Sequence, residues 1–284
     1  MRGSFHEKMT ARRSSWHTAR VSVKPPPAVP APAATLVLLR DRPGGGVETL
    51  LIQRHQASKF AGGDFVFPGG KIEPNDAPDD ASAWCAGFDP MAAARRLGLE
   101  ADRRAAVAYW VGAIREAFEE VGVLLAYGPE RHPVDVGPRF EDYRRACQLD
   151  HRVFWQMVRG ERLTLATDRL AYFAHWITPE ENPLRFDTRF FAAETPAGQA
   201  ARADLREIVA VRWLTPAEAL AARARGEVSL RLPTIRNLTV FEGAPSVKEA
   251  LARLQGLRVD PIRPRLVMES GQPRAILPGE PGWF

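Results

Sequence analysis

Three glutamates crowded on one turn of a predicted helix have the clearest capacity for chemistry in this chain. Glu116, Glu119 and Glu120 stand at positions i, i+3 and i+4, so a helix places their side chains on one face. Like charges at that spacing repel each other, and a solvated acidic surface is the simplest interpretation. A divalent cation would reverse the sign of that interaction, because Mg²⁺ and Mn²⁺ prefer carboxylate oxygens as ligands. The triplet therefore predicts a metal site.

The surroundings of the triplet favour the metal site over a solvated surface. Arg115 supplies an internal counter-charge, and Gly122 stands where the glycine that ends a helix is expected. The helix is predicted from about Ala105 to Val121. Its other side is apolar at helical spacing, with Val107, Trp110, Val111, Ile114, Phe118 and Val121. A helix that is tightly packed on one side and groups its acids near one end is typical of a scaffold for a site.

A second motif lies upstream, Phe67-Pro68-Gly69-Gly70-Lys71-Ile72-Glu73. Together with the segment 115–123 it resembles the signature of the Nudix hydrolases. That signature is a glycine, a glutamate a few residues later, and then Arg-Glu-apolar-any-Glu-Glu-any-Gly-apolar. Every fixed position of the second half is matched here. In the first half Gly70 is matched, and Asp76 stands where the first glutamate is expected.

The two halves of the signature are further apart than is usual in that family. The resemblance therefore implies an insertion at about residues 77–104, either a substrate lid or a dimer contact. It also implies an α+β fold of the α/β/α sandwich type, with a mixed sheet and a second helical insertion at about 138–165.

Periodicity along the chain predicts the same mixture of elements. Strands are expected at 34–40, 49–54, 64–67, 170–177, 185–192, 209–214 and 261–267. Helices are expected at 90–97, 105–121, 140–149, 153–159, 234–240 and 246–254. Asp89 is predicted to cap the first helix, and Thr215 to begin a further one.

Composition indicates which class of protein this is and which kinds of partner it favours. The chain has 284 residues, 45% hydrophobic and 26% charged, as in a soluble globular protein of one or two domains. A net charge of +5 favours anionic partners, and small phosphorylated molecules fit better than nucleic acid because no basic block is interleaved with aromatic residues. Cys85 and Cys147 have no disulfide or zinc pattern, and no apolar run reaches the roughly 18 residues of a membrane helix.

The two ends of the chain are expected to lie outside the folded domain. Residues 1–33 are rich in Arg and Ser and then in Pro and Ala, and predict a disordered leader. One domain is predicted over 34–254, and 255–284 would be an extension packed on it or trailing it. The last residues, Gly282-Trp283-Phe284, are not a peroxisomal Ser-Lys-Leu signal, so a cytoplasmic protein is expected.

The resemblance implies hydrolysis of a nucleoside diphosphate linked to another group. The implied cofactor is Mg²⁺ or Mn²⁺, which would neutralise phosphate oxygens and lower the pKa of a bound water. Its expected ligands are Glu116, Glu119, Glu120 and the backbone carbonyl of Gly69 or Gly70. Arg115 is expected to orient a glutamate, with a contact to the substrate phosphate as the alternative. Catalysis is thus assigned to Glu119, Glu116 and Arg115.

The general base is the least determined role. A motif glutamate is one option, and a distant loop that carries Glu194, Asp204 and Glu207 is the other. A solvated surface carboxylate is the simpler interpretation for each of the three.

A further resemblance indicates the substrate. Leu51, Arg54, Lys59 and Gly63 resemble an additional motif of the coenzyme A diphosphatases. The segment 185–191 and the insertion inside the signature resemble the peroxisomal branch of that group. The implied reaction converts coenzyme A or its thioesters to 3′,5′-ADP and 4′-phosphopantetheine. The expected substrate contacts are Arg54, Lys59, Phe67 and Gly70.

Other functions remain open at this point. An ADP-ribose or nucleotide-sugar diphosphatase would use the same metal site. A non-catalytic Nudix-fold ligand sensor belongs to a different class, but such proteins typically lose at least one motif glutamate, and all are present here. The expected partner is a small nucleotide-type molecule, and a homodimer is left open.

Overall fold

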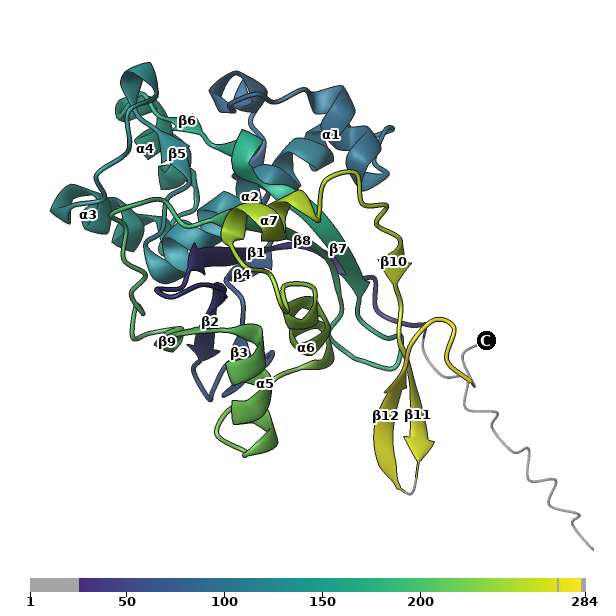
Figure 1. The fold of residues 1–284 in the computed structure, drawn as a ribbon. Coiled ribbons are helices and arrows are strands. Elements are labelled where there is room, and N and C mark those ends of the chain that lie inside the picture. The colour runs from purple at the N-terminus through teal and green to yellow at the C-terminus, as the bar shows by residue number, and fades with distance from the viewer. Residues whose placement is uncertain (1–25, 270, 282–284) are drawn as a thin grey trace, which may run out of the picture.

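A mixed β-sheet forms the centre of the protein. A computed structural model describes residues 26–269 and 271–281, and within them eight strands form one sheet (Figure 1). Their order is β10-β7-β8-β1-β2-β3, with β4 paired to β1 and β9 to β2. β1 runs parallel to β8, and β10 to β7, whereas the other pairs are antiparallel. The strands are β1 (Ala31–Asp41), β2 (Val47–Arg54), β3 (Phe65–Val66), β4 (Gly69–Lys71), β7 (Ala171–Ile177), β8 (Phe186–Glu194), β9 (Ile208–Leu214) and β10 (Pro261–Ile262).

Helices cover both faces of this sheet, which confirms the predicted α+β sandwich (Figure 1). One layer contains α1 (Pro90–Leu97), α2 (Arg103–Val121), α3 (Pro138–Cys147) and α4 (Arg152–Gly160). The other contains α5 (Pro216–Ala224), α6 (Leu232–Thr239) and α7 (Val247–Ala252). β1 is buried on both faces, because Leu36 and Leu38 pack in the core with α2 while Val37 and Leu39 pack in the opposite core.

Local signals position the helix that carries the three glutamates. The side chain of Asp102 accepts a hydrogen bond from the N–H of Ala105 at the start of α2. Gly122 ends the helix in the left-handed conformation, with φ of 72°. The predicted caps at Asp89 and Thr215 are also confirmed, since Asp89 accepts from the N–H of Met91 and Thr215 forms a capping box with Glu218.

The structure corrects several expected bounds, and three of these corrections have a clear cause. β1 begins at Ala31 rather than 34, because the Pro- and Ala-rich segment is already extended and pairs with β8. The expected strand 64–67 stops at Val66, and Pro68 separates it from β4. The expected strand 261–267 is divided at Pro264 into β10, which joins the main sheet, and β11 (Arg265–Glu269), which forms a separate hairpin with β12 (Gln272–Ile276).

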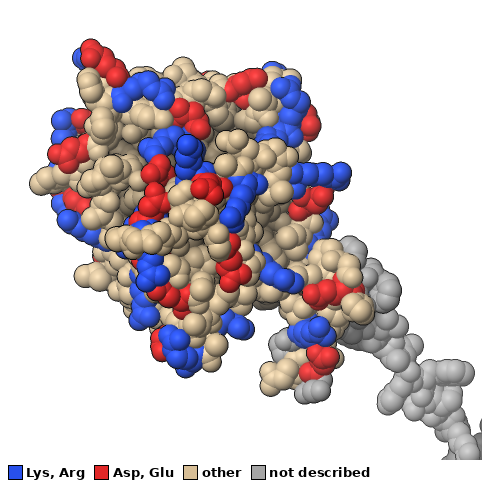
Figure 2. All heavy atoms as spheres, viewed as in Figure 1, with Lys and Arg blue, Asp and Glu red and all other residues tan. Residues whose placement is uncertain are grey.

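Several short elements gave no sequence signal. They are β5 (Ala126–Tyr127), β6 (Thr164–Leu165), and the 3₁₀ turns η1 (Pro74–Asp76), η2 (Ala81–Trp84), η3 (Pro129–Arg131) and η4 (Thr167–Arg169). The predicted leader falls mainly on residues 1–25, outside the described residues. Among the helices that the structure describes, none combines the length and the apolar character needed to cross a bilayer. On the face shown in Figure 2, basic and acidic side chains are interspersed, without one continuous basic patch.

Candidate active site

A buried ion-pair network centred on Arg115 holds the acidic side of α2. The Arg115 side chain is 1% exposed, and all five of its N–H donors have an acceptor. Nε and Nη2 donate to the two oxygens of Asp76 at 2.6 and 3.0 Å, and Nη2 also donates to the Lys71 carbonyl at 2.9 Å. Nη1 donates to Glu116 at 2.9 Å and to Glu119 at 3.0 Å. Asp76 therefore anchors Arg115, which in turn orients two of the glutamates.

Two glycines allow β4, the short strand that follows β3, to approach these carboxylates. A Cβ at Gly70 would lie 2.5 Å from Oε1 of Glu116, and one at Gly69 would lie 2.5 Å from the Ala34 carbonyl oxygen. The contact at Gly69 is with backbone, so glycine is required there, whereas a side chain at position 70 would displace the carboxylate of Glu116. The N–H of Gly69 donates to Glu120 at 2.8 Å. β4 thus lies directly against α2, while a metal contact from the Gly69 carbonyl stays a prediction.

The insertion formed by α3 and α4 contacts the C-terminal end of α2. Arg144 donates to the backbone carbonyls of Glu119 and Glu120 at 3.0 and 2.7 Å, and Gln148 donates to that of Glu119 at 2.8 Å. These carbonyls belong to the last turn of a helix, where intrahelical donors run out. Nδ1 of His151 lies 3.1 Å from Oε1 of Glu119. This insertion therefore forms part of the site.

The other insertion, 77–104, packs on α2 away from the cleft described below. Its apolar residues Ala93, Ala94 and Leu97 belong to the same core as α2. Among the described residues, none of those that line the cleft comes from 77–104. The geometry gives no support to a substrate lid in this segment.

Burial makes the carboxylates of α2 difficult to keep ionised. It raises the pKa of Glu116 to about 7, although the charge of Arg115 acts in the opposite direction. Burial likewise raises the pKa of Glu119, and it raises that of Glu120 well above its usual range, with the charge of Glu116 as the next cause. A divalent cation would offset this repulsion, and oxygen ligands suit a hard cation such as Mg²⁺.

The carboxylates do not form a ready-made metal cage in the part of the chain that the structure describes. They face arginines instead: Glu116 and Glu119 face Arg115, and Glu120 accepts from Arg54 at 3.3 Å. The donor set fits a divalent cation, because an ionised carboxylate has about four lone-pair sites and the arginines do not use all of them.

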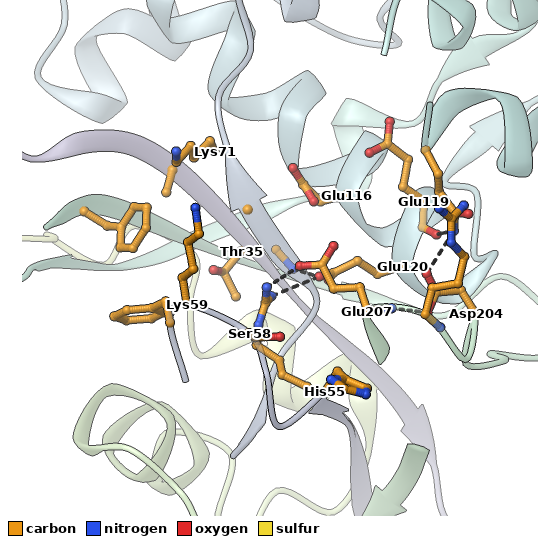
Figure 3. A pocket seen from close by; sticks show the side chains of 18 of the residues that line it. Thr35, His55, Ser58, Lys59, Lys71, Glu116, Glu119, Glu120, Asp204 and Glu207 are labelled. Carbon is orange, nitrogen blue, oxygen red and sulfur yellow. Dashed lines mark hydrogen bonds and ion pairs between the residues drawn. The ribbon is translucent and has the colours of Figure 1, made fainter. Parts of the chain in front are cut away.

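An open cleft of about 1000 Å³ runs past the glutamates. Figure 3 shows Glu119 and Asp204 toward one end of this cleft and Lys59 and Lys71 toward the other, with Thr35 between them. The cleft is lined by strands β1, β4 and β8, by α2, and by the loops at 54–60 and 204–207. Its size and its polar lining fit an elongated, charged small molecule.

The three candidate general bases occupy different environments. Glu194 pairs with Arg169 at 3.3 Å and lies outside the cleft. Asp204 lines the cleft, but one of its oxygens accepts three backbone N–H groups of the loop that follows. Glu207 also lines the cleft, is 54% exposed, and is paired with Arg54. Glu207 is therefore the candidate whose carboxylate is most accessible to a substrate.

Two expected substrate contacts lie differently in the structure. Arg54 lines the cleft, but its two terminal nitrogens are bonded to Glu120 and Glu207. These bonds join the loop at 204–207 to α2. Phe67 is 3% exposed and packs in the core on the sheet face opposite α2. Successive side chains of an extended chain point to opposite faces, so Phe67 points the same way as Phe65, two residues before it. Lys59 and Gly70 do line the cleft.

Several cleft residues had not been predicted from sequence. They are His151, Gln148, Lys71, Phe60 and Phe186. Lys71 lies inside the quoted upstream motif and Phe186 inside the segment 185–191, so proximity to a motif was the only available signal. His151 and Gln148 reach the site through the folding of the α3–α4 insertion, which no local pattern indicates.

The chain is similar to known Nudix proteins. A family model described as the NUDT19 Nudix domain matches residues 103–240. The acyl-coenzyme A diphosphatase NUDT19 of Xenopus laevis is 32% identical over 208 residues, covering 61% of this chain and 54% of the frog protein. The human protein of the same name is 29% identical over 257 residues, covering 77% of this chain and 68% of its own length. The chain thus spans about half of the frog relative's length.

A solved structure has the same fold. The crystal structure of a NUDIX hydrolase from Alicyclobacillus acidocaldarius superposes with a TM-score of 0.66 at 24% identity, covering 79% of this chain and 96% of that one. The shared fold, the matched family model and the Arg115-centred glutamate helix agree with one another. The chain is therefore similar to the Nudix hydrolases in its fold and over residues 103–240 of its sequence.

Proposed function

We propose that this protein is a divalent-metal-dependent diphosphatase that hydrolyses coenzyme A or its thioesters. The products would be 3′,5′-ADP and 4′-phosphopantetheine or its acyl form. The observation that carries the proposal is the set of three α2 glutamates lining an open cleft of about 1000 Å³. Similarity to the frog and human acyl-coenzyme A diphosphatases supports coenzyme A as the substrate class.

The reaction adds one water to a diphosphate and breaks one P–O bond of the bridge. Each product keeps one of the two bridge phosphates, and the water proton must be accepted by a base. When bound, Mg²⁺ or Mn²⁺ would neutralise phosphate oxygens and make the water more acidic. Glu116, Glu119 and Glu120 are the residues proposed to hold it.

Protein residues would organise the rest of the site. Arg115, fixed by Asp76, keeps Glu116 and Glu119 on the cleft side of α2. His151 supports Glu119 from the α4 side. We assign proton acceptance to Glu207, because its exposed carboxylate is joined to Glu120 through Arg54.

A substrate panel tests the proposal. The purified protein is incubated with Mg²⁺ or Mn²⁺ and with coenzyme A, an acyl-coenzyme A, ADP-ribose or a nucleotide sugar, and the products are separated by chromatography. We expect 3′,5′-ADP from coenzyme A at a higher kcat/KM than for the other classes. Faster cleavage of ADP-ribose or the nucleotide sugar would refute the assigned substrate, and no cleavage of any compound would refute catalysis.

A further inference from the structure

Two lysines of the cleft stand apart from its ion-pair network. The described residues include only three lysines, Lys59, Lys71 and Lys248, and the first two line the cleft. In the described part of the chain, neither forms an ion pair with a carboxylate, whereas Arg54 in the same cleft is bonded to two. The ammonium groups of Lys59 and Lys71 are therefore available to an anionic ligand.

Aromatic rings stand beside these lysines and are held in place. Phe60 follows Lys59 in the chain, and its ring centroid lies 4.9 Å from that of Phe186 in an edge-to-face arrangement. The guanidinium of Arg231 lies 5.0 Å from the centre of the Phe60 ring, and Asp64 fixes that guanidinium at 2.6 Å. Because both rings line the cleft, they form a wall against which a flat ring can pack.

The sheet register fixes this wall relative to the glutamates. Lys71 of β4 is opposite Ala33 of β1, and Ala33 neighbours Thr188 of β8. The carbonyl of Lys71 accepts Nη2 of Arg115 at 2.9 Å, which ties its strand to α2. In Figure 3, Lys59 and Lys71 lie at the end of the cleft away from Asp204. A substrate that spans the cleft would therefore meet the glutamates with one part and the lysines with another.

The chemistry of this end selects the kind of group that it can bind. An acyl chain gains nothing from two ammonium groups, whereas a phosphomonoester carries up to two negative charges. Lysine binds phosphate as a compact point charge, and the adjacent rings suit a purine. Charge and shape together fit a phosphorylated purine nucleoside.

We propose that Lys59, Lys71, Phe60 and Phe186 form a subsite for a purine nucleoside that bears a phosphomonoester on its ribose. The subsite makes the protein select coenzyme A over the same molecule without its 3′-phosphate. This inference rests on the proposed function and deepens it, because it assigns the orientation of the substrate and the group that is recognised.

Kinetics with a matched pair of substrates test the subsite. We expect the wild type to have a higher kcat/KM for coenzyme A than for dephospho-coenzyme A. The double variant Lys59→Ala/Lys71→Ala should lower that ratio by about tenfold, the effect of losing one or two partly exposed charge-assisted contacts. Equal use of the two substrates by the wild type, or an unchanged ratio in the double variant, would overturn the proposal.

Other variants separate charge from packing. Lys59→Arg/Lys71→Arg keeps both charges and should retain most of the preference. Lys248→Ala removes the remaining lysine of the described residues, on α7 and outside the cleft, and should leave the ratio unchanged. Phe186→Ala should raise KM for both substrates alike. If it instead changes only the dependence on acyl-chain length, the wall binds the acyl group and the proposal fails.

A binding measurement makes the subsite testable without turnover. By calorimetry, the wild type should bind adenosine 3′,5′-bisphosphate more tightly than AMP. In the double lysine variant, the ratio of the two Kd values should fall by about tenfold. Absence of hydrolysis with this preference intact would refute the proposed function and support the subsite. Equal affinities for the two nucleotides would refute the subsite whatever the activity.

Discussion

The charged side chains at the two ends of the cleft differ in whether they have partners. At the acidic end, Glu116 and Glu119 are bonded to Arg115 and Glu120 is bonded to Arg54, all of them largely buried. At the other end, Lys59 and Lys71 have no carboxylate partner among the described residues. Buried charges need partners because they have lost water, whereas an exposed ammonium group stays hydrated until a ligand arrives.

This difference indicates that the acidic end serves catalysis and that the lysine end serves substrate recognition. A network that uses every donor of Arg115 fixes the position of its carboxylates before any ligand binds. Unpaired lysines on the cleft lining contribute little to the fold and are available to select a substrate. Changes at the acidic end should therefore affect turnover and stability, whereas changes at the lysine end should affect selectivity.

The largest expected effect is the loss of turnover in Glu119→Gln. The variant keeps the shape of the side chain but removes the charge that would hold the metal ion. We expect kcat to fall on the order of 10³-fold, equivalent to several kcal/mol of metal-assisted stabilisation. The change is measured under saturating coenzyme A, with Glu180→Gln, on an exposed loop outside the cleft, as the control. Unchanged turnover in Glu119→Gln would contradict the assigned metal site.

Arg115→Ala should be the most damaging change to stability. It leaves Asp76, Glu116 and Glu119 buried without their common partner, so we expect unfolding to become easier by about 3–5 kcal/mol. Urea denaturation measures this difference. Arg152→Ala removes an arginine from an exposed pair with Asp150, and should leave the free energy of unfolding nearly unchanged. Similar losses of unfolding free energy in both variants would show that the Arg115 network stabilises the fold no more than an exposed ion pair does.

Glu207→Gln tests the proton acceptor. We expect kcat to fall about 10²-fold, at the lower end of general-base contributions, with KM for coenzyme A little changed. Asp204 is held by backbone N–H groups, so Asp204→Asn is expected to disturb the loop rather than the proton transfer. A kcat equal to that of the wild type in Glu207→Gln would contradict this assignment and would favour a motif glutamate as the general base.

Metal ions should stabilise the acidic end specifically. At a concentration one hundred times its Kd, Mn²⁺ should add about 2.7 kcal/mol to the free energy of unfolding, or on the order of 5 °C in Tm. The shift is measured by calorimetry against a sample in EDTA, and it should shrink in Glu119→Gln but persist in Lys59→Ala/Lys71→Ala. An equal shift in Glu119→Gln would place the ion elsewhere.

A pH dependence of the metal-free protein is also expected. Burial raises the pKa of Glu116 from 4.5 to about 7, so the folded state holds this proton between those two pH values while the unfolded chain has released it. The stabilisation is complete below pH 4.5 and is lost as pH rises through about 7. In EDTA, the free energy of unfolding should therefore decline more steeply across this range in the wild type than in Glu116→Gln. Equal slopes would contradict the crowding of these carboxylates.

Much of the site could be predicted because its signals are local. The spacing of Glu116, Glu119 and Glu120 already determines that they share a helix face, and Gly122 marks where that helix ends. The glycines of the upstream loop identify a close backbone approach. The class of the fold follows for the same reason, since strand and helix periodicities are properties of consecutive residues.

Side-chain partners could not be predicted in the same way. Arg54 carries the charge expected of a phosphate contact, yet Glu120 and Glu207 compete for it in the folded protein. Phe67 lies next to the glycine loop in sequence but points into the opposite core. His151 lies 32 residues from Glu119 in the chain and reaches it because α3 and α4 fold back onto α2.

The sequence by itself determined the acidic helix, the glycine loop and the family that they indicate, because these depend on spacing within short segments. The tertiary structure decided that Asp76 anchors Arg115 across 39 residues and that Lys59 and Lys71 share one end of the cleft. Such contacts depend on which strands become neighbours in the sheet. Strand order is fixed by the burial of both sheet faces as a whole, and no single segment encodes it.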